Sequence, residues 1–252
     1  SNKVVIIDDN SKKLQETDKK IAIQVHVFYP DLLEEIYQNI SKMPYKYDLF
    51  ISTDTKAKKS KIEQFFKQKK IKCSEVKVFE NRGRDILPFI SQLKKRIDKY
   101  DFVCHLHTKK SEYSDFGNNW RTYLYENLFG TENNIKSIFY KLNKKKVGLI
   151  YPEPFESIKK RMQIGGNQEW MDELCKRLEI PNSFNNRFPA GSMFWVKKEV
   201  LSDLIKNVQV QDFPEEKGQI DGTMAHAIER IIEVIAQEKN YKAIQIQNKT
   251  TK

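Results

Sequence analysis

Apolar segments that alternate with amphipathic ones set the fold of the first half of this chain. Strand-like patterns occupy residues 21–30, 47–55, 74–81 and 100–107. Helical spacing of apolar residues follows each of the first three, as in Leu32, Leu33, Ile36 and Ile40. Strands joined by helices through short loops predict a parallel sheet with helices on both faces, a Rossmann-like arrangement.

The order of patterns changes from Trp120 onward. Helical patterns and single strand patterns follow at residues 120–130, 134–145, 147–154, 167–180, 192–196 and 221–241. The last of these is the strongest helical pattern in the chain. No internal repeat and no linker rich in Pro, Gly or Ser interrupts them. We therefore expect a polar lead-in, residues 1–20, and one α/β domain, residues 21–252.

Composition bounds the class of protein. The 252 residues carry a net charge of +11, which favours an anionic partner: nucleic acid, a phosphorylated small molecule or an anionic membrane surface. Scattered lysines also serve solubility. The three cysteines form no CxxC pair, so neither a zinc ribbon nor a disulfide framework is indicated. No signal-peptide pattern is visible and no apolar run approaches the roughly 20 residues of a spanning helix, so we expect a soluble, cytoplasmic protein.

The carboxyl ends of the predicted strands are polar and mostly basic, and ligands of open parallel sheets bind at that edge. At one strand-to-helix junction, NRGRD, Asn81 precedes a Gly83 that is flanked by Arg82 and Arg84. Paired guanidinium groups suit phosphate or carboxylate oxygens, and the helix after Asp85 would point its N-terminus at the same anion. The alternative is that Asp85 only caps the helix and both arginines are solvated.

The predicted strand at 100–107 ends in two histidines, His105 and His107, and Lys109 and Lys110 follow. Two residues apart on a strand, the imidazoles point to the same side. They would contact sugar hydroxyls or phosphate while the lysines neutralise charge, or bind a metal with His226 or a carboxylate as a third ligand. A purely structural role is the third interpretation, and all three stay open at this point.

Small residues precede large aromatic ones in the segment FPAGSMFWV. Gly191 and Ser192 allow a ligand to approach the backbone closely, and Trp195 offers a flat apolar face on which a sugar ring can stack. The same composition also suits a protein core, which is the alternative.

Acidic side chains and one histidine gather before and within the strongest helical pattern. Asp221, beside Gly222 at the expected start of this helix, is our candidate general base, and His226 follows one turn later. The alternative is that Asp221 or Thr223 caps the helix, and a cap at the edge of a site can hold both roles.

Taken together, these stretches resemble the rhamnan synthesis protein F family of bacterial polysaccharide glycosyltransferases. The matching segments are VHVFYPDLLEEI, YDLFIST, VKVFENRGRDILPFI, YDFVCHLHTKKS with WR shortly after it, FPAGSMFWV and DFPEEKGQIDGTMAHAIERI. They run in order from Ile21 to Ala236. The resemblance implies a GT-A-like glycosyltransferase fold with a nucleotide-binding half, residues 21–119, and an acceptor half, residues 120–252.

In that fold a DxD motif usually holds the divalent metal that bridges the donor diphosphate, and in this chain HLH stands in its place. This departure from the family pattern favours transfer without a metal cofactor, with Mg²⁺ or Mn²⁺ as the alternative. The implied donor-binding residues are Asp54, Asn81, Arg82, Gly83, Arg84, Asp85, His105, His107, Lys109 and Lys110. The implied acceptor-binding residues are Gly191, Ser192, Trp195 and His226, and Asp221 is the implied base of an inverting transfer.

The implied donor is a nucleotide diphosphate sugar such as dTDP-rhamnose. The implied acceptor is a lipid-linked glycan at the cytoplasmic face of the membrane, where positive charge assists peripheral association with anionic lipid. A non-catalytic glycan- or nucleotide-binding module of a larger polysaccharide-synthesis protein is the alternative. A nucleic-acid-binding protein is disfavoured because the lysines are scattered and no recognition motif is present.

Overall fold

A computed structural model describes residues 3–108, 110, 115–219 and 221–252. Eight strands form one sheet in the order β1-β8-β6-β7-β5-β2-β3-β4. Their bounds are β1 Val5–Ile7, β2 Ile21–His26, β3 Asp48–Thr53, β4 Glu75–Val78, β5 Phe102–His107, β6 Val147–Pro152, β7 Phe194–Lys197 and β8 Lys242–Asn248. Strand β7 runs antiparallel to β5 and β6, and the other pairings are parallel.

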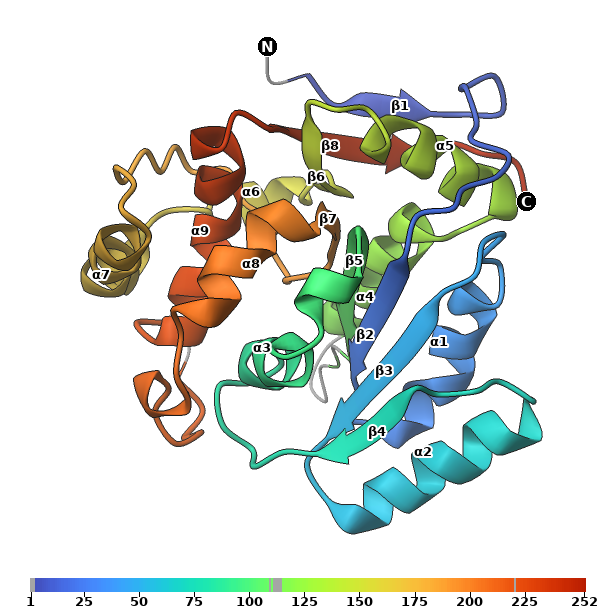
Figure 1. The fold of residues 1–252 in the computed structure, drawn as a ribbon, viewed down its shortest axis with the longest axis horizontal. Coiled ribbons are helices and arrows are strands. Elements are labelled where there is room, and N and C mark those ends of the chain that lie inside the picture. The colour runs from blue at the N-terminus through green and yellow to red at the C-terminus, as the bar shows by residue number, and fades with distance from the viewer. Residues whose placement is uncertain (1–2, 109, 111–114, 220) are drawn as a thin grey trace.

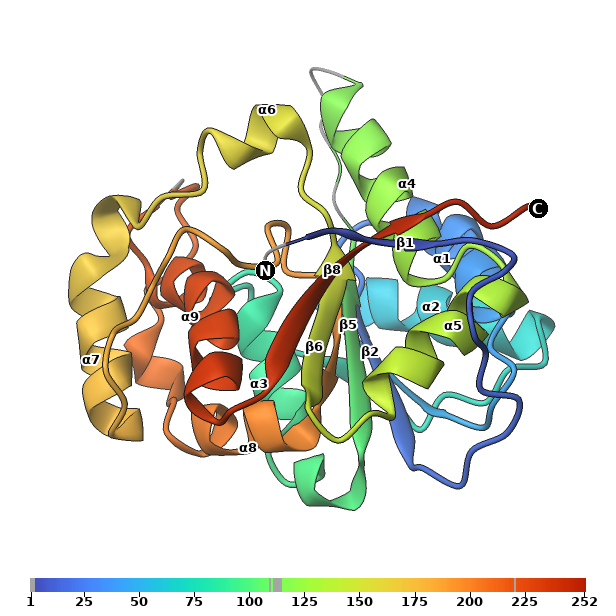
Figure 2. The ribbon, with the colours of Figure 1, turned by 90° about the horizontal axis from the view of Figure 1, so that it is seen from above.

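Helices cover both faces of this sheet (Figures 1 and 2). On one face lie α1 Leu33–Ile40, α2 Lys56–Gln68, α4 Phe116–Leu128 and α5 Glu132–Leu142, and on the other α3 Ile86–Leu93, α7 Gln168–Leu178, α8 Lys198–Lys206 and α9 Met224–Glu238. The short helices are α6 Glu156–Lys159 and the 3₁₀ turns η1 Pro30–Leu32, η2 Ile97–Lys99, η3 Gly165–Asn167 and η4 Val210–Asp212. Each face buries its own apolar cluster under its helices. The predicted class, an α/β fold with a mainly parallel sheet flanked by helices, is confirmed.

The pairing of β2 with β5 positions the polar edge of the sheet. Gln24 lies opposite His105, and His26 lies opposite His107. Alternate residues of a strand share a face, so these four polar side chains lie on one side of the sheet, the side covered by α3. The register therefore places two histidines of β5 beside a histidine of the neighbouring strand.

Two strands of the sheet were not predicted from the sequence. Residues Val5–Ile7 belong to the expected polar lead-in, yet they form β1 and pair with β8, with Val5 opposite Ile246. A strand of three residues carries little periodicity, and its partner lies at the other end of the chain. The prediction of a polar lead-in is therefore corrected for Val5–Ile7, because these residues form an edge strand of the sheet. The functional division of the domain into two halves stays a prediction.

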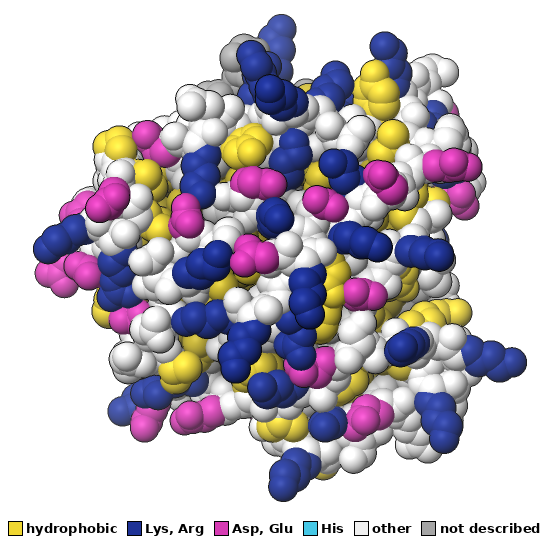
Figure 3. Space-filling model, in the orientation of Figure 1, with side chains coloured by type: hydrophobic (Ala, Val, Ile, Leu, Met, Phe, Trp, Pro, Cys, Tyr) yellow, Lys and Arg dark blue, Asp and Glu magenta, His cyan; other side chains and the backbone are white. Residues whose placement is uncertain are grey.

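Basic side chains are spread over the molecule. The face in Figure 3 carries Lys and Arg side chains at many separate places, interspersed with Asp and Glu. Mixed charge of this kind is typical of a solvated surface. Among the described helices, none combines the length with the apolar character needed to cross a membrane.

Candidate functional site

A carboxylate and two histidines form the first centre of the candidate site, at the carboxyl end of β5. Nε2 of His105 lies 2.9 Å from Oδ2 of Asp85, and Nε2 of His107 lies 3.8 Å from the same oxygen. Asp85 directly precedes α3 and makes no side-chain capping hydrogen bond to it. The alternative that Asp85 serves only as a helix cap is therefore wrong, since its carboxylate is turned toward the strand.

The histidines keep this carboxylate charged. Burial alone would raise the pKa of Asp85, but the nearby His107 and the hydrogen bond from His105 outweigh burial and lower its pKa below the usual range. A buried carboxylate is stable only when it is paired in this way. The centre therefore holds an anion inside the edge of the sheet.

A third histidine, His26, belongs to the same centre and was missed in the sequence. It ends β2, and its Nδ1 lies 2.8 Å from the Ser52 hydroxyl. Burial lowers the pKa of His26 to about 4, although the charge of Asp85 acts in the opposite direction. His26 is therefore neutral at pH 7. The register of β2 against β5 would have revealed it, because that register places His26 beside His107.

Gly191 connects this centre to a second group of polar residues, which contains Asp221, His226 and Glu229. Nε2 of His107 donates to the carbonyl of Gly191 over 2.6 Å, and the amide of Gly191 donates to Oε2 of Glu229 over 2.9 Å. Gly191 has a φ of +92°, which favours glycine, and a Cβ there would lie 2.9 Å from Leu124. The close approach predicted at Gly191 is thus made by another side chain of the same protein, Leu124.

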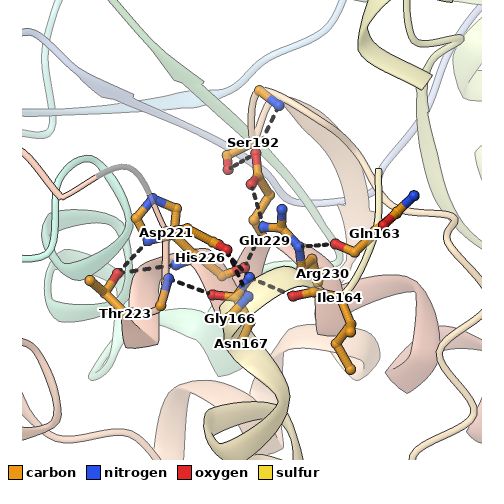
Figure 4. Close-up of polar contacts among 12 residues, drawn as sticks. Gln163, Ile164, Gly166, Asn167, Ser192, Asp221, Thr223, His226, Glu229 and Arg230 are labelled. Atoms are coloured by element: carbon orange, nitrogen blue, oxygen red, sulfur yellow. Dashed lines mark hydrogen bonds and ion pairs between the residues drawn. The ribbon is translucent and has the colours of Figure 1, made fainter. Parts of the chain in front are cut away.

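Asp221 lies in the second group, shown in Figure 4. Its Oδ2 accepts from the amide of Gly166 over 2.8 Å, and its Oδ1 accepts from Nδ2 of Asn167 over 2.5 Å. Burial would raise the pKa of Asp221, but these hydrogen bonds lower it. Thr223, and not Asp221, caps α9, since its hydroxyl accepts from the amide of His226. Asp221 is therefore an exposed, ionised carboxylate held by the η3 turn.

His226 contributes a buried nitrogen to the second group (Figure 4). Its Nδ1 lies 2.6 Å from the Thr223 hydroxyl, while Nε2 is buried and has no hydrogen-bond partner among the described residues. Burial lowers the pKa of His226, and the charge of Arg84 lowers it further. Because Arg84 precedes α3, the two groups of residues face each other at one edge of the sheet.

Glu229 and Arg230 lie on the next turn of α9. Glu229 is one of the acidic side chains that the sequence gathers around this helix, whereas Arg230 was missed. Glu229 accepts from Gly191 and from the hydroxyl of Ser192, the second contact over 3.3 Å. Nε of Arg230 donates to the carbonyl of Gln163 over 2.8 Å. In the sequence Arg230 looks like part of the solvent-facing side of an amphipathic helix, so no local signal marks it.

The basic residues of the predicted donor site differ in their freedom to bind an anion. Arg84 donates to the carbonyl of Gln219 over 2.6 Å, and Lys110 contacts Asp31 over 2.5 Å. Arg82 forms a backbone bridge to Glu215, and its Nε is buried without a partner among the described residues. Arg82 is thus the member of this set that keeps its charge unpaired within that part of the chain.

The remaining donor-site residues lie at the edges of the same region. Asp54, after β3, pairs with Lys58 over 2.7 Å. Asn81 is exposed, and Gly83 is buried with a φ of +66°. Lys109 lies outside the described residues.

Two predicted ligand contacts are corrected. The indole of Trp195 is fully buried among aromatic side chains on the opposite face of the sheet from the histidines, and its Nε1 donates to the carbonyl of Leu128 over 3.0 Å. His105 is also fully buried, with Nδ1 at 2.8 Å from Gln24 and Nε2 at 2.9 Å from Asp85. Trp195 therefore belongs to the core, and both ring nitrogens of His105 already face protein atoms.

The same contacts test the metal interpretation of the histidine pair. Both nitrogens of His105 face oxygen atoms of the protein, and His226 lies in the other group. No set of three or more His, Cys, Asp or Glu side chains in the described part of the chain is arranged to hold a metal ion. These residues do not fit a His-based metal site, and transfer without a metal stays a prediction.

A comparison with known families decides the lineage. The rhamnan synthesis protein F family model matches residues 2–241. The chain belongs to this family. The resemblance expected from the sequence motifs is thereby confirmed, over more of the chain than those motifs span.

The chain also resembles a part of two longer proteins. Two proteins of Xanthomonas campestris pv. campestris, each named uncharacterized protein WxcX, are 35% identical over 215 residues, or 84% of this chain. The aligned region is only 30% of their length, so this chain corresponds to a minor part of those relatives. A solved CMP:2-keto-3-deoxy-manno-octonic acid synthetase complexed with CTP aligns with a TM-score of 0.47 at 8% identity, over 93% of this chain and 91% of that one.

Proposed function

We propose that this rhamnan synthesis protein F family member is a glycosyltransferase with a GT-A-like arrangement. It would move a sugar, rhamnose or a related one, from a nucleotide diphosphate donor to a lipid-linked cell-surface polysaccharide. Family membership supports the coarser role in polysaccharide synthesis. The observation that carries the finer proposal is the link through Gly191, which joins the Asp85 centre to the group containing Asp221 and His226.

The donor is proposed to bind at the carboxyl ends of strands β2, β3, β4 and β5. Asp54 lies near the nucleoside, and Arg82 and Arg84, before α3, meet the diphosphate as its negative charge grows. Arg82 is suited to this because its charge is unpaired within the described chain. Lys110 would join them by exchanging its contact with Asp31 for a phosphate oxygen. Lys109, its neighbour in the sequence, is proposed for the same role.

The acceptor is proposed to enter beside Ser192 and His226. Its hydroxyl oxygen attacks the anomeric carbon while Asp221 takes the hydroxyl proton, and the bond from that carbon to the diphosphate oxygen breaks. One carboxylate base suffices for such a single displacement, which inverts the anomeric configuration. Asp221 suits this role because its hydrogen bonds keep it ionised and its side chain reaches solvent.

The test is calorimetric titration with dTDP, UDP, GDP and dTDP-rhamnose, each in Mn²⁺ and in EDTA. We expect one nucleotide to bind with micromolar affinity and to keep that affinity in EDTA. Affinity that needs Mn²⁺ would contradict the metal-free mechanism. Absence of binding for the whole panel would contradict the donor site and favour a non-catalytic glycan-binding module.

A non-catalytic module is the second candidate, and the segment from His105 to His107, which stands where the family resemblance leads us to expect a DxD motif, favours it. In a longer protein, such a domain can bind a glycan or nucleotide for another domain to act on. The two candidates differ in turnover. Release of nucleotide from a bound donor in the presence of a glycan acceptor supports the transferase, and binding without any release supports the module.

A further inference from the structure

The two carboxylate oxygens of Asp85 have different surroundings. Oδ2 faces His105 and His107, at 2.9 and 3.8 Å. Oδ1 accepts no hydrogen bond from a described residue and is not among the buried atoms that lack a partner. The side chain keeps 13% of its surface exposed. Asp85 thus turns one oxygen inward and leaves the other at the surface of the site.

A chain of buried hydrogen bonds fixes the proton on His105. The carbonyl of Ile51 only accepts, so the group of Gln92 that lies 2.9 Å from it is the donor Nε2. Oε1 of Gln92 then accepts from Nε2 of Gln24 over 2.9 Å, and Oε1 of Gln24 faces Nδ1 of His105 at 2.8 Å. Nδ1 of His105 must therefore carry a proton.

This protonated Nδ1 decides how His105 meets Asp85. With Nδ1 donating to Gln24, the other ring nitrogen, Nε2, faces Oδ2 of Asp85 at 2.9 Å, and this hydrogen bond holds the inward oxygen of the carboxylate against the ring. The ring of Phe89 stacks on His105 at 4.3 Å and closes this side from water. The inward oxygen is held, so the outward Oδ1 has a fixed direction.

His26 adds a donor beside this acceptor. The Ser52 hydroxyl accepts from Nε2 of Gln24 over 2.9 Å, so its own proton points to Nδ1 of His26 at 2.8 Å. The proton of the neutral His26 ring is then on Nε2, for which no hydrogen-bond partner is present among the described residues. No ion pair joins His26 to Asp85 in that part of the chain, although the charge of Asp85 acts on His26.

We propose that Asp85 Oδ1 and His26 Nε2 form a subsite for hydroxyl groups of a neutral sugar ring. This inference rests on the proposed transferase function and identifies its sugar-binding part. A carboxylate accepts strongly from hydroxyls and repels phosphate, so the diphosphate lies instead toward Arg82 and Arg84. His105, Gln24 and Gln92 are positioning residues, because they act only through Asp85.

The test compares two affinities in each variant: the free nucleotide and its sugar conjugate, using dTDP with dTDP-rhamnose, UDP with UDP-glucose and GDP with GDP-mannose. Asp85→Asn keeps an acceptor for His105 but turns a donor outward, and His26→Asn keeps an acceptor for Ser52 but loses Nε2. We expect each change to reduce the gain in affinity from the sugar about tenfold or more, as for loss of a hydrogen bond to a charged group. Affinity for the free nucleotide should stay within about twofold.

Asp203→Asn is the matched control, because its side chain is 59% exposed and pairs only with Lys239 among the described residues. It should leave both affinities unchanged. Equal loss of affinity for nucleotide and sugar conjugate in Asp85→Asn, in a variant whose thermal unfolding is cooperative, would overturn the subsite. So would an unchanged gain from the sugar.

A second measurement separates this inference from the proposed function. Saturation-transfer NMR with L-rhamnose, D-glucose, D-galactose and D-mannose needs no nucleotide. If no nucleotide binds, the transferase proposal fails, while a sugar signal that disappears in Asp85→Asn still supports the subsite. Without any sugar signal from the wild-type chain, the subsite fails as well.

Discussion

Nε2 of His105 lies 2.9 Å from Oδ2 of Asp85, and this contact joins the end of β5 to the start of α3 through a fully buried imidazole and a partly exposed carboxylate. Behind His105, the amides of Gln24 and Gln92 extend the contact to the backbone of β3. The polar edge of the sheet is therefore a connected hydrogen-bonded unit whose protonation affects stability as well as binding.

Stability is expected to depend on pH through His26. Its pKa is about 4 in the folded chain, against a usual value near 6.5 in the unfolded chain. Between these values the unfolded chain binds a proton at His26 that the folded chain does not, so stability falls as pH decreases through this window. From pH 7 to pH 5 this residue should account for a loss of about 2 kcal/mol, measured by urea unfolding.

His26→Asn is the variant for this measurement, since its side-chain oxygen can still accept from Ser52. The difference in unfolding free energy between pH 7 and pH 5 should shrink by about 2 kcal/mol in the variant. Arg and Lys side chains do not titrate between pH 5 and pH 7, so they add nothing to the pH dependence of either protein. An identical pH difference in both proteins would refute the assignment of a neutral, buried His26.

Gly83 is expected to tolerate no side chain. It has a φ of +66°, and a Cβ would lie 2.4 Å from Cβ of Leu87 and 2.7 Å from the ring of Phe213, both buried. Gly218 has a similar φ of +74°, but a Cβ at that position would have no described atom within 4 Å, so it isolates the backbone cost. Gly218→Ala should cost about 1 kcal/mol, and Gly83→Ala about 2 kcal/mol more, from overpacking. Equal losses of unfolding free energy in the two variants, measured by urea unfolding, would show that α3 and Phe213 move aside without a free-energy cost.

Trp195 is expected to affect stability and not sugar binding. Its indole is fully buried and packs against Phe129 and Phe139, at ring distances of 5.5 and 4.8 Å. Trp195→Ala should lower the unfolding free energy by roughly 3–5 kcal/mol. Trp170→Ala, at a partly buried position, should cost less. Loss of sugar affinity in a Trp195→Phe chain of near wild-type stability would restore the role of this residue in acceptor binding.

Local patterns predicted much of the fold. Alternation in residues 21–27 and the helical spacing after Pro30 depend only on near neighbours, and the parallel order followed from them. The pairing of Val5 with Ile246 depends on the two ends of the chain, so no short window contains it. For the same reason, β1 and β8 were not predicted.

The candidate site was predicted in part, for a similar reason. His105 and His107 share a strand, so period-two spacing alone placed them on one side, whereas His26 required the register of two strands. Phe194 and Trp195 point to opposite faces, and the sequence does not say which face carries the site. Glu229 belongs to the acidic group that the sequence shows, but its contacts with Gly191 and Ser192 were not predicted, because they come from a segment far from it in the chain.

Asp221→Asn is expected to separate catalysis from binding. The variant can still accept from the amide of Gly166, so the η3 turn should keep its place, but its amide cannot take a proton from the acceptor hydroxyl. Donor turnover should fall roughly 100-fold or more, as for loss of a general base, with nucleotide affinity within about twofold. Asp203→Asn, an exposed carboxylate that pairs with Lys239, is the control and should retain full turnover. Undiminished turnover in Asp221→Asn would exclude it as the base, and Glu229, which accepts from Ser192 over 3.3 Å, would then be the carboxylate to replace next.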